Sequence, residues 1–536
     1  MPGIALVTAT LHLVYLYADT RVPRDLGLYY SSVPLALRAM SGTARLEGGP
    51  WGRLLLQPTG WYNVVQAGCL RVFGRSPDAF QVPDVLAATL IVLFTGWIAR
   101  RLGGDRAGAI AAALVASMPG VVVAARTSWL HVPEAALALG AVVAWMADPL
   151  LRRWRTPLIV GVCVALGLAL RPSGLVWMGS LGLLPLASVW LARRAGEKAP
   201  WGKVALTLGV AALVLPIPLR NIQEYLGAKA AARERYATTL PDLGLQVKLL
   251  FGGIPTAALA AALGMRLGGR VARTEDPARA PALLLLGAWV VGALVLWAGF
   301  QAGIDNFTLL CPALAALAAV TLAARPRLGL AVALAAWIPF AVMQFVPAQG
   351  PDALTHRVPG LRDLAMEPHL LNQYRAYSRF GAPEVRDLVS ATCGERAQPR
   401  SCVIVADQGL YQPFGEEPGH LELFLAGEER VRLENLRMLR SANQLPIAAL
   451  AEFHCGERDI AWRLRWPTSL PMLEQLTQAQ DLRPVWALEV GPGCTFVWFT
   501  PAGMVKYPDH LPLAGHRVAP GDPLGAPPQG PPQERR

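Results

Sequence analysis

The feature that most constrains this chain is a series of long apolar segments in its first 346 residues. Most of them are about 16 to 22 residues long, the length at which a helix crosses a hydrocarbon core of ~30 Å. Only 16% of the residues are charged, against roughly a quarter in a soluble domain. The sequence predicts a polytopic α-helical membrane protein with about 11 transmembrane helices. The predicted helices lie near residues 1–18, 84–99, 107–124, 134–147, 157–170, 174–191, 204–219, 247–264, 281–299, 307–323 and 328–346.

Basic residues gather in the short loops on one side of the predicted membrane. With a cytoplasmic N-terminus, the inside loops read RRLGGDR, DPLLRRWRT, ARRAGEKAPWGK, GMRLGGRVARTEDPAR and ARPR. The short outside loops are poor in Lys and Arg, as the positive-inside rule requires. Residues 1–346 hold 30 basic and 15 acidic residues, while residues 347–536 hold 19 and 22. Loop topology therefore accounts for the net charge of +12, and we expect no nucleic-acid partner.

Two long segments are expected outside the membrane. The first, residues 19–83, contains RDLGLYYSSVPLALRAM and LLLQPTGWYNVVQAGCLRVFG, whose spacing is typical of amphipathic surface helices. The second, residues 347–518, combines strand-like runs (CVIVADQ, PVWALEV, CTFVWFT) with helical runs (RVRLENLRMLRS, PIAALAEF). It predicts a small α/β periplasmic domain after the membrane domain of residues 1–346. Residues 519–536 are rich in Pro and Gly and are expected to form a disordered tail.

Four of the seven cysteines fall in the predicted periplasmic domain. Cysteines in an oxidising compartment pair, and four of them allow three connectivities. We expect Cys393–Cys402 and Cys455–Cys494 to be the pairs. Four reduced thiols are the alternative, and a zinc site is disfavoured because no CxxC or HxxxH spacing accompanies the cysteines.

Several motifs follow one another along residues 1–345 in a recognisable order. An acid followed by two tyrosines (Asp25, Tyr29, Tyr30) comes after the first helix, and QPTGWY begins the second surface helix at Gln57. VFGRSPDAFQVPDVLAATL then leads into a helix that ends in a basic pair, followed by MPGVVVAARTSWLHVPEAAL, LALRPSGLVW and PIPLRN. This order resembles the GT-C superfamily of membrane glycosyltransferases. It is most similar to the branch with bacterial lipid A aminoarabinose transferases and protein O-mannosyltransferases.

Three positions depart from the pattern of that family. Gln57 stands where a Lys or His is usual, and the turn before the fourth helix carries His131 and Glu134 where the family often has Asp. Asn306 and Phe307 stand where the family shows Arg-Tyr. These departures bear on the identity of the donor and on activity.

The resemblance implies an inverting transfer of a sugar from a polyprenyl-phosphate donor to an envelope acceptor: a glycan, a lipid or a protein. The reaction would take place on the periplasmic side of a bacterial inner membrane, where no nucleotide is available, and the chain has no P-loop or Rossmann glycine motif. Asp25 would be the base, with Glu134 as a second carboxylate that orients the acceptor or binds a metal. Whether a divalent metal (Mg or Mn) takes part stays open. The residues expected to bind substrate are Tyr29, Tyr30, Gln57, Arg126, His131, Arg171 and Arg220.

Each of these residues also suits a purely structural role. Asp25 is a good N-cap for a surface helix, and Glu134 favours the positive end of a helix dipole. The arginines suit phospholipid headgroups, the tyrosines suit the membrane interface, and His131 suits an ordinary loop. Two other functions remain open for the whole chain. One is a transporter or flippase of envelope lipids, which mid-membrane charges and repeated halves would favour; the other is a non-catalytic GT-C-like scaffold.

Overall fold

The structure is a computed structural model of the chain. It describes residues 2–18, 33–40, 59–73, 77–126, 130–171, 174–219, 255, 258–259, 261–263, 278–300, 309–343, 382–394, 401–406, 430–435, 446–454, 475–491, 494–502 and 516–517. The chain divides into two compact units. The first contains most of the helices, together with the start of helix α5 up to Tyr62. The second contains helix α3, the rest of α5 and the C-terminal sheet.

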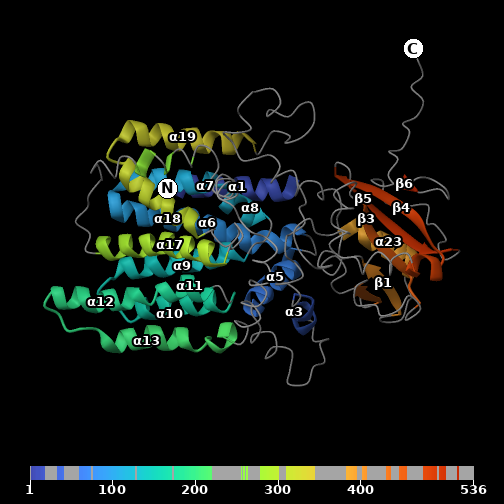
Figure 1. Cartoon of the computed structure of the whole chain (residues 1–536), viewed down its shortest axis with the longest axis horizontal. Helices are drawn as coiled ribbons and strands as arrows, with labels where there is room; N and C mark the ends of the chain where they lie inside the picture. The colour runs from blue at the N-terminus through green and yellow to red at the C-terminus, as the bar shows by residue number, and fades with distance from the viewer. Residues whose placement is uncertain are drawn as a thin grey trace, which may run out of the picture. The chain divides into compact units, whose positions relative to one another are not determined.

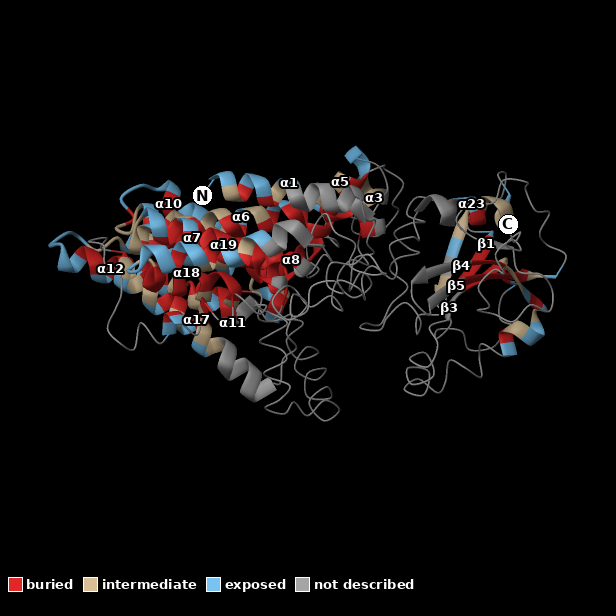
Figure 2. Ribbon diagram, turned by 90° about the horizontal axis from the view of Figure 1, so that it is seen from above, coloured by how far each residue is buried: buried red, intermediate tan, exposed pale blue. Residues whose placement is uncertain are grey.

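The helices of the first unit run side by side in one bundle (Figure 1). Their buried positions are filled largely by Ala, Val and Leu, and Figure 2 shows these residues in the interior. Small residues allow close approach of the backbones: a Cβ on Gly103 of α6 would lie 3.2 Å from the Cα of Val320 on α18. The helices of this bundle are α1 (Pro2–Ala18), α6 (Pro77–Gly103), α7 (Asp105–Ser117), α8 (Pro119–Arg126), α9 (His131–Ala147), α10 (Arg155–Leu168), α11 (Gly174–Ser180), α12 (Leu183–Arg194), α13 (Trp201–Ala212), α17 (Arg279–Phe300), α18 (Leu310–Leu322) and α19 (Pro326–Met343). Helix α3 (Val33–Met40) and most of α5 (Gly60–Phe73) belong to the second unit.

The prediction of one continuous helix is wrong for two segments, because each segment contains a break in the structure. The segment 107–124 divides into α7 and α8, and 174–191 divides into α11 and α12. At the first break Met118 is extended, with φ −75° and ψ 122°. Pro119 explains this, since a proline disfavours the helical conformation of the residue before it and has no N–H for the helix ladder. The second break is a turn at Leu181 and Gly182.

One helical stretch in the described residues, Ala79–Gly103, is both long and apolar enough to cross a membrane. Six shorter apolar stretches, of 10 to 17 residues, accompany it. The expected number of about eleven crossings stays a prediction. The described apolar helices that are shorter are His131–Ala147, Arg155–Leu168, Trp201–Ala212, Arg279–Gly292, Leu310–Leu322 and Pro326–Ile338.

The C-terminal part contains a six-stranded mixed sheet in the order β2-β1-β3-β5-β4-β6. Strand β1 pairs in parallel with β2 and β3, while the β3–β5, β4–β5 and β4–β6 pairs are antiparallel. Val405, Leu450 and Val497 belong to its apolar core. The elements are α23 (Ala382–Cys393), β1 (Cys402–Ala406), β2 (Val431–Asn435), β3 (Ala449–His454), β4 (Leu482–Gly491), β5 (Cys494–Pro501) and β6 (His516–Arg517).

Two runs that were expected to be helical, RVRLENLRMLRS and PIAALAEF, contain strands β2 and β3 instead. In β2, Leu433 pairs with Ile404 of β1. In β3, Leu450 pairs with Val405 on one side and Phe499 on the other. Leu, Ala and Glu favour helices locally, but pairing and burial in a sheet outweigh that preference.

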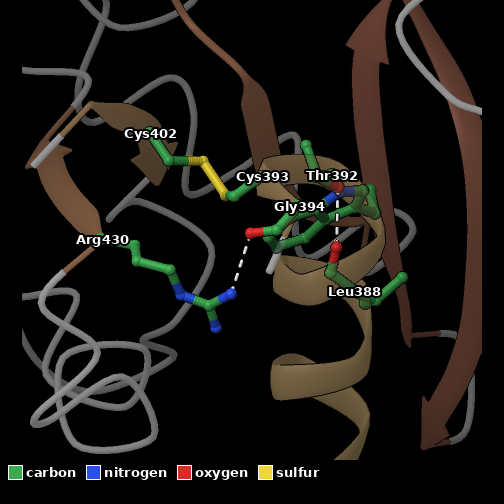
Figure 3. The surroundings of a disulfide bond; sticks show 7 residues. Leu388, Thr392, Cys393, Gly394, Cys402 and Arg430 are labelled. Atoms are coloured by element: carbon green, nitrogen blue, oxygen red, sulfur yellow. Dashed lines mark hydrogen bonds between the residues drawn. A yellow bond between two sulfur atoms is a disulfide. The ribbon is translucent and has the colours of Figure 1, made fainter. Parts of the chain in front are cut away.

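Helix α23 is attached to the sheet by a covalent bond and two hydrogen bonds. Cys393 at its end forms a disulfide with Cys402 at the start of β1, which is one of the two predicted pairs (Figure 3). Arg430 donates from Nη1 to the carbonyl of Gly394 at 2.9 Å, and Trp498 donates from Nε1 to Thr392 Oγ1 at 3.1 Å. The second predicted pair depends on Cys455, which lies outside the described residues.

Candidate active site

The first turn of α9 carries two of the predicted site residues in the interior of the helical unit. His131 and Glu134 are 7% and 3% exposed. The residues HVPEAAL begin a helix because Pro133 suits the first turn and Glu134 is a favourable anion at the positive end of the helix dipole. One carboxylate oxygen of Glu134, Oε1, is buried and has no hydrogen-bond partner in the described part of the chain. That oxygen can accept a bond from a hydroxyl or an ammonium group of a ligand.

Arg171 joins this turn from the end of α10. Its side chain is 3% exposed, and its Nη1 lies 2.8 Å from Nδ1 of His131. The same Nη1 also contacts Nε2 of His131, and because a guanidinium can only donate, the imidazole supplies the acceptor. Arg171 is also the charge that acts electrostatically on Glu134. The side chains of Arg171, His131 and Glu134 therefore form one buried cluster.

The start of α5 is held beside the same end of α10. The backbone N–H of Thr59 donates to the carbonyl of Ala169 at 2.9 Å, and the indole of Trp61 donates to the carbonyl of Leu166 at 3.1 Å. Ala169 precedes Arg171 by two residues. The structure therefore places the TGWY part of the QPTGWY motif next to the end of α10, just before Arg171, although the two are far apart in sequence.

Tyr62 of that motif donates a hydrogen bond to Oδ1 of Asp84 on α6, at 2.6 Å. Both residues are buried, as is Gln81, one turn before Asp84. Sequence reasoning missed this pair. The available signal was Asp84 itself, because it is the only charged residue between Ala79 and Ala99 in an otherwise apolar helix.

The structure thus brings three predicted site residues together: His131, Glu134 and Arg171. Arg126 is the last residue of α8, which packs near the start of α9, but its side chain is not described. The other predicted residues lie outside the described part of the chain: Asp25, Tyr29, Tyr30, Gln57 and Arg220.

A divalent metal, which the sequence leaves open, would need a set of carboxylate or imidazole ligands at this site. Among the described residues, no group of three His, Cys, Asp or Glu side chains is placed to hold a metal ion. His131 and Glu134 are one turn apart, but the imidazole already faces the guanidinium of Arg171. The described residues of this cluster therefore offer no set of metal ligands.

No family model matches the chain, and no curated protein matches it. Among solved structures, ArnT from Cupriavidus metallidurans bound to undecaprenyl phosphate matches with a TM-score of 0.54 and 14% identity, over 94% of this chain and 98% of that chain. The chain has the GT-C fold. The same ArnT in the apo state has a TM-score of 0.49 at 15% identity, over 92% of this chain and 97% of that one. An Archaeoglobus fulgidus oligosaccharyltransferase matches with a TM-score of 0.48 and 13% identity, over 96% of this chain and 74% of that chain.

The resemblance drawn from the sequence motifs is confirmed at the level of the fold. A GT-C fold implies a polytopic membrane protein, in agreement with the apolar helices. In such a protein, buried ionisable groups are costly and mark functional sites. The cluster of Arg171, His131 and Glu134 is therefore the candidate active site of this GT-C chain.

Proposed function

We propose that the chain is an inverting glycosyltransferase of a bacterial inner membrane. It transfers a sugar from a polyprenyl-phosphate donor to an envelope acceptor, which is a glycan, a lipid or a protein, on the periplasmic side. The observation that carries the proposal is the buried cluster of Arg171, His131 and Glu134 inside a GT-C fold. The ArnT structure with the same fold is bound to undecaprenyl phosphate.

Arg171 is the residue that binds the donor phosphate. A guanidinium makes paired, charge-assisted hydrogen bonds to phosphate oxygens, and these are stronger in a buried site than in water. As the bond between the anomeric carbon and the phosphate oxygen breaks, the bonding electron pair goes to the phosphate. Arg171 stabilises that developing charge. His131 holds the guanidinium in place from one side.

The acceptor hydroxyl needs a base as it attacks the anomeric carbon. Asp25 fills this role on the resemblance to the GT-C family: it takes the proton of the hydroxyl while the new carbon–oxygen bond forms. Glu134 orients the acceptor through its open Oε1. A single displacement of this kind inverts the anomeric centre.

The proposal is tested with purified protein in detergent and with a panel of radiolabelled undecaprenyl-phosphate sugars, using an envelope extract as acceptor. Arg171→Gln is expected to reduce transfer by about 10²- to 10³-fold, as the loss of one charge-stabilising donor does. Asp25→Asn and Glu134→Gln test the two carboxylates. Arg153→Gln is the matched control, because Arg153 is an exposed arginine at the basic end of the bundle.

If Arg171→Gln transferred sugar as fast as the wild type, the cluster would not be part of the active site. Equal transfer by the wild type and Asp25→Asn would remove Asp25 as the base and leave Glu134 as the carboxylate to examine. No transfer by the wild type from any donor of the panel would overturn the proposal in favour of a transporter or a scaffold.

A further inference from the structure

One end of the helical unit carries a strongly basic surface that the proposed reaction does not use. It lies where α10 and α13 begin and where α12 ends, and α13 packs against both of the other helices (Figure 1). Residues 148–156 and 192–203, which form these helix ends and their loops, hold seven basic and two acidic side chains. The excess of positive charge is suited to an anionic partner.

Contacts between the two loops hold part of this charge in place. Arg152 forms an ion pair with Glu197, which joins the loop before α10 to the loop before α13. Lys203 donates from Nζ to the carbonyl of Arg152, and the same Nζ lies 5.3 Å from the centre of the Trp154 ring. An ammonium group has three N–H donors, so Lys203 keeps two of them for an anion.

The loop that presents Trp154 is fixed by its own backbone. Leu151 has φ 52°, a left-handed conformation that is uncommon for a bulky residue, and its side chain is buried. Asp148 accepts the backbone N–H groups of Arg152 and Arg153. The positive-inside rule depends on how many basic residues a loop contains and not on how they are held. It therefore accounts for the number of charges here but not for this fixed arrangement.

The remaining cations of the surface are available to a ligand. Arg155, Arg193 and Arg194 are exposed, and none of them has an acidic partner in the described part of the chain. Arg194 lies over the ring of Trp190, 5.4 Å from its centre. Trp154 and Trp190 are themselves exposed, and tryptophan favours the level of the lipid headgroups.

Exposed apolar side chains continue along the same three helices. They are Leu158 and Ile159 of α10, Leu186 of α12 and Leu208 of α13. A phospholipid matches both parts, because its phosphate would meet the cations and its acyl chains would pack on the apolar side chains. A nucleic acid or an acidic protein would use the cations alone.

We propose that this surface binds an anionic phospholipid in the membrane leaflet at the basic end of the bundle. We call it the α10–α13 basic surface, and it consists of Trp154, Arg155, Trp190, Arg193, Arg194 and Lys203. Lys203 and Arg155 donate to the phosphate oxygens, while the fixed loops keep the cost of ordering these groups low. The inference depends on the membrane location that the GT-C fold implies and not on the proposed transfer reaction.

The test measures binding of a fluorescent phosphatidylglycerol to the purified full chain in an uncharged detergent. Phosphatidylcholine with the same acyl chains and fluorophore is the uncharged reference. We expect saturable binding of phosphatidylglycerol that is at least ~10²-fold tighter than that of phosphatidylcholine, because each basic residue near an anionic lipid contributes about 5-fold. Inorganic phosphate at the same concentration should not displace the lipid, since it lacks the acyl chains.

The double variant Arg155→Gln with Lys203→Gln is expected to bind phosphatidylglycerol about 25-fold more weakly, with binding of phosphatidylcholine unchanged. The matched control is Arg325→Gln with Arg327→Gln, which removes the same charge from exposed residues where α18 ends and α19 begins. The control should bind within about 2-fold of the wild type. Glu197→Gln removes a negative charge and frees Arg152, so it should bind about 5-fold more tightly.

Equal weakening in the two double variants would overturn the inference, because general attraction to positive charge would then explain binding. Displacement of the lipid by inorganic phosphate would also overturn it, since the surface would then be a phosphate site. Thermal unfolding identifies a double variant that has lost its fold, and Glu197→Gln then decides. Binding by Glu197→Gln that is unchanged or weaker would count against the surface and would leave the proposed function in place.

Discussion

Asp148 ends α9 and caps the turn that leads into α10. Its carboxylate accepts the backbone N–H groups of Arg152 and Arg153 at 2.9 and 2.8 Å and the hydroxyl of Thr156 at 3.1 Å. Partial burial alone would raise the pKa of Asp148. The hydrogen bonds from Arg153, Arg152 and Thr156, together with the charge of Lys203, outweigh burial and lower the pKa below its usual value of 3.8.

A lowered pKa makes a definite prediction for stability against pH. The capping bonds contribute fully above pH 3.8, the usual value, and are lost as pH falls through the lower pKa of the folded state. We expect the wild type to unfold at a higher temperature than Asp148→Asn at neutral pH. The difference in unfolding temperature between the wild type and Asp148→Asn should narrow only below pH 3.8. Thermal unfolding in detergent from neutral pH to about pH 3 measures it.

Asp105→Asn is the control for this prediction. Asp105 begins α7 and pairs with Arg100, but both side chains are exposed, and exposed ion pairs contribute little to stability. A difference between the wild type and Asp148→Asn that is the same at every pH would contradict the assignment.

At the residue scale, the sequence pointed to some residues of the buried cluster and of the neighbouring pair but not to others. His131, Glu134 and Arg171 were predictable because polar residues at the ends of apolar segments are conspicuous and the motif order resembles a known family. The contact of Tyr62 with Asp84 was not, because nothing in the chain indicates which faces of two helices meet. Asp84 had also been placed at a helix start, whereas α6 begins at Pro77 and Asp84 lies inside it.

At the scale of helices, a glycine marks a close approach of α10 and α13. A Cβ on Gly161 of α10 would lie 3.0 Å from the carbonyl oxygen of Thr207 on α13 and 3.0 Å from the Cβ of Val210. The hydroxyl of Thr207 also bonds the carbonyl of Pro157 on α10, at 3.2 Å. These two helices therefore pack backbone against backbone, as small residues permit in membrane helix pairs.

We expect Gly161→Ala to lower the free energy of unfolding by about 1–3 kcal/mol, because the added methyl meets a backbone atom that cannot rotate away. The matched control is Gly209→Ala on α13, where an added Cβ meets nothing within 4 Å. The control should be neutral or should gain up to about 1 kcal/mol from the better helix propensity of Ala. Denaturation in mixed detergent measures both. Equal effects would mean that α10 and α13 do not approach as described.

Whether a segment forms a helix or a strand was predictable where the conformational preference of its residues agrees with how the segment is buried. It was not predictable where the two conflict. CVIVADQ is rich in β-branched residues and CTFVWFT in β-branched and aromatic ones, and these runs form β1 and most of β5. The Leu-rich and Ala-rich runs that contain β2 and β3 have helical preferences, so only their pairing partners, distant in sequence, decide the outcome. The break at Met118 had a local signal in Pro119, but the apolar character of both segments continues through the breaks at Met118 and Leu181, so apolar length alone joins the pieces.

At the scale of the whole chain, charges separate the two ends of the helical bundle. At the end where α9, α12 and α18 finish, cations lie over tryptophans: Arg101 over Trp97, Lys203 over Trp154 and Arg194 over Trp190, at 5.3 to 5.4 Å. Arg101 also donates to the carbonyl of Met146, the penultimate residue of the C-terminal turn of α9, at 3.2 Å. Arginine, lysine and tryptophan together are typical of a cytoplasmic membrane interface. The cluster of Arg171, His131 and Glu134 lies at the opposite ends of α9 and α10.

This separation predicts the orientation of the chain. Lys198 is exposed in the loop between α12 and α13, where Arg152 pairs with Glu197 at the basic end. A cysteine placed by Lys198→Cys should react with a membrane-impermeant maleimide in inverted vesicles and not in intact spheroplasts. The parent chain, with its free Cys69, Cys163 and Cys311, gives the background labelling.

On the other side of the membrane, Cys393 and Cys402 should resist the maleimide until they are reduced, because an oxidising compartment maintains their disulfide. Labelling of Lys198→Cys in spheroplasts would show that the chain has the opposite orientation. The candidate site would then lie on the side where nucleotide-linked donors are available.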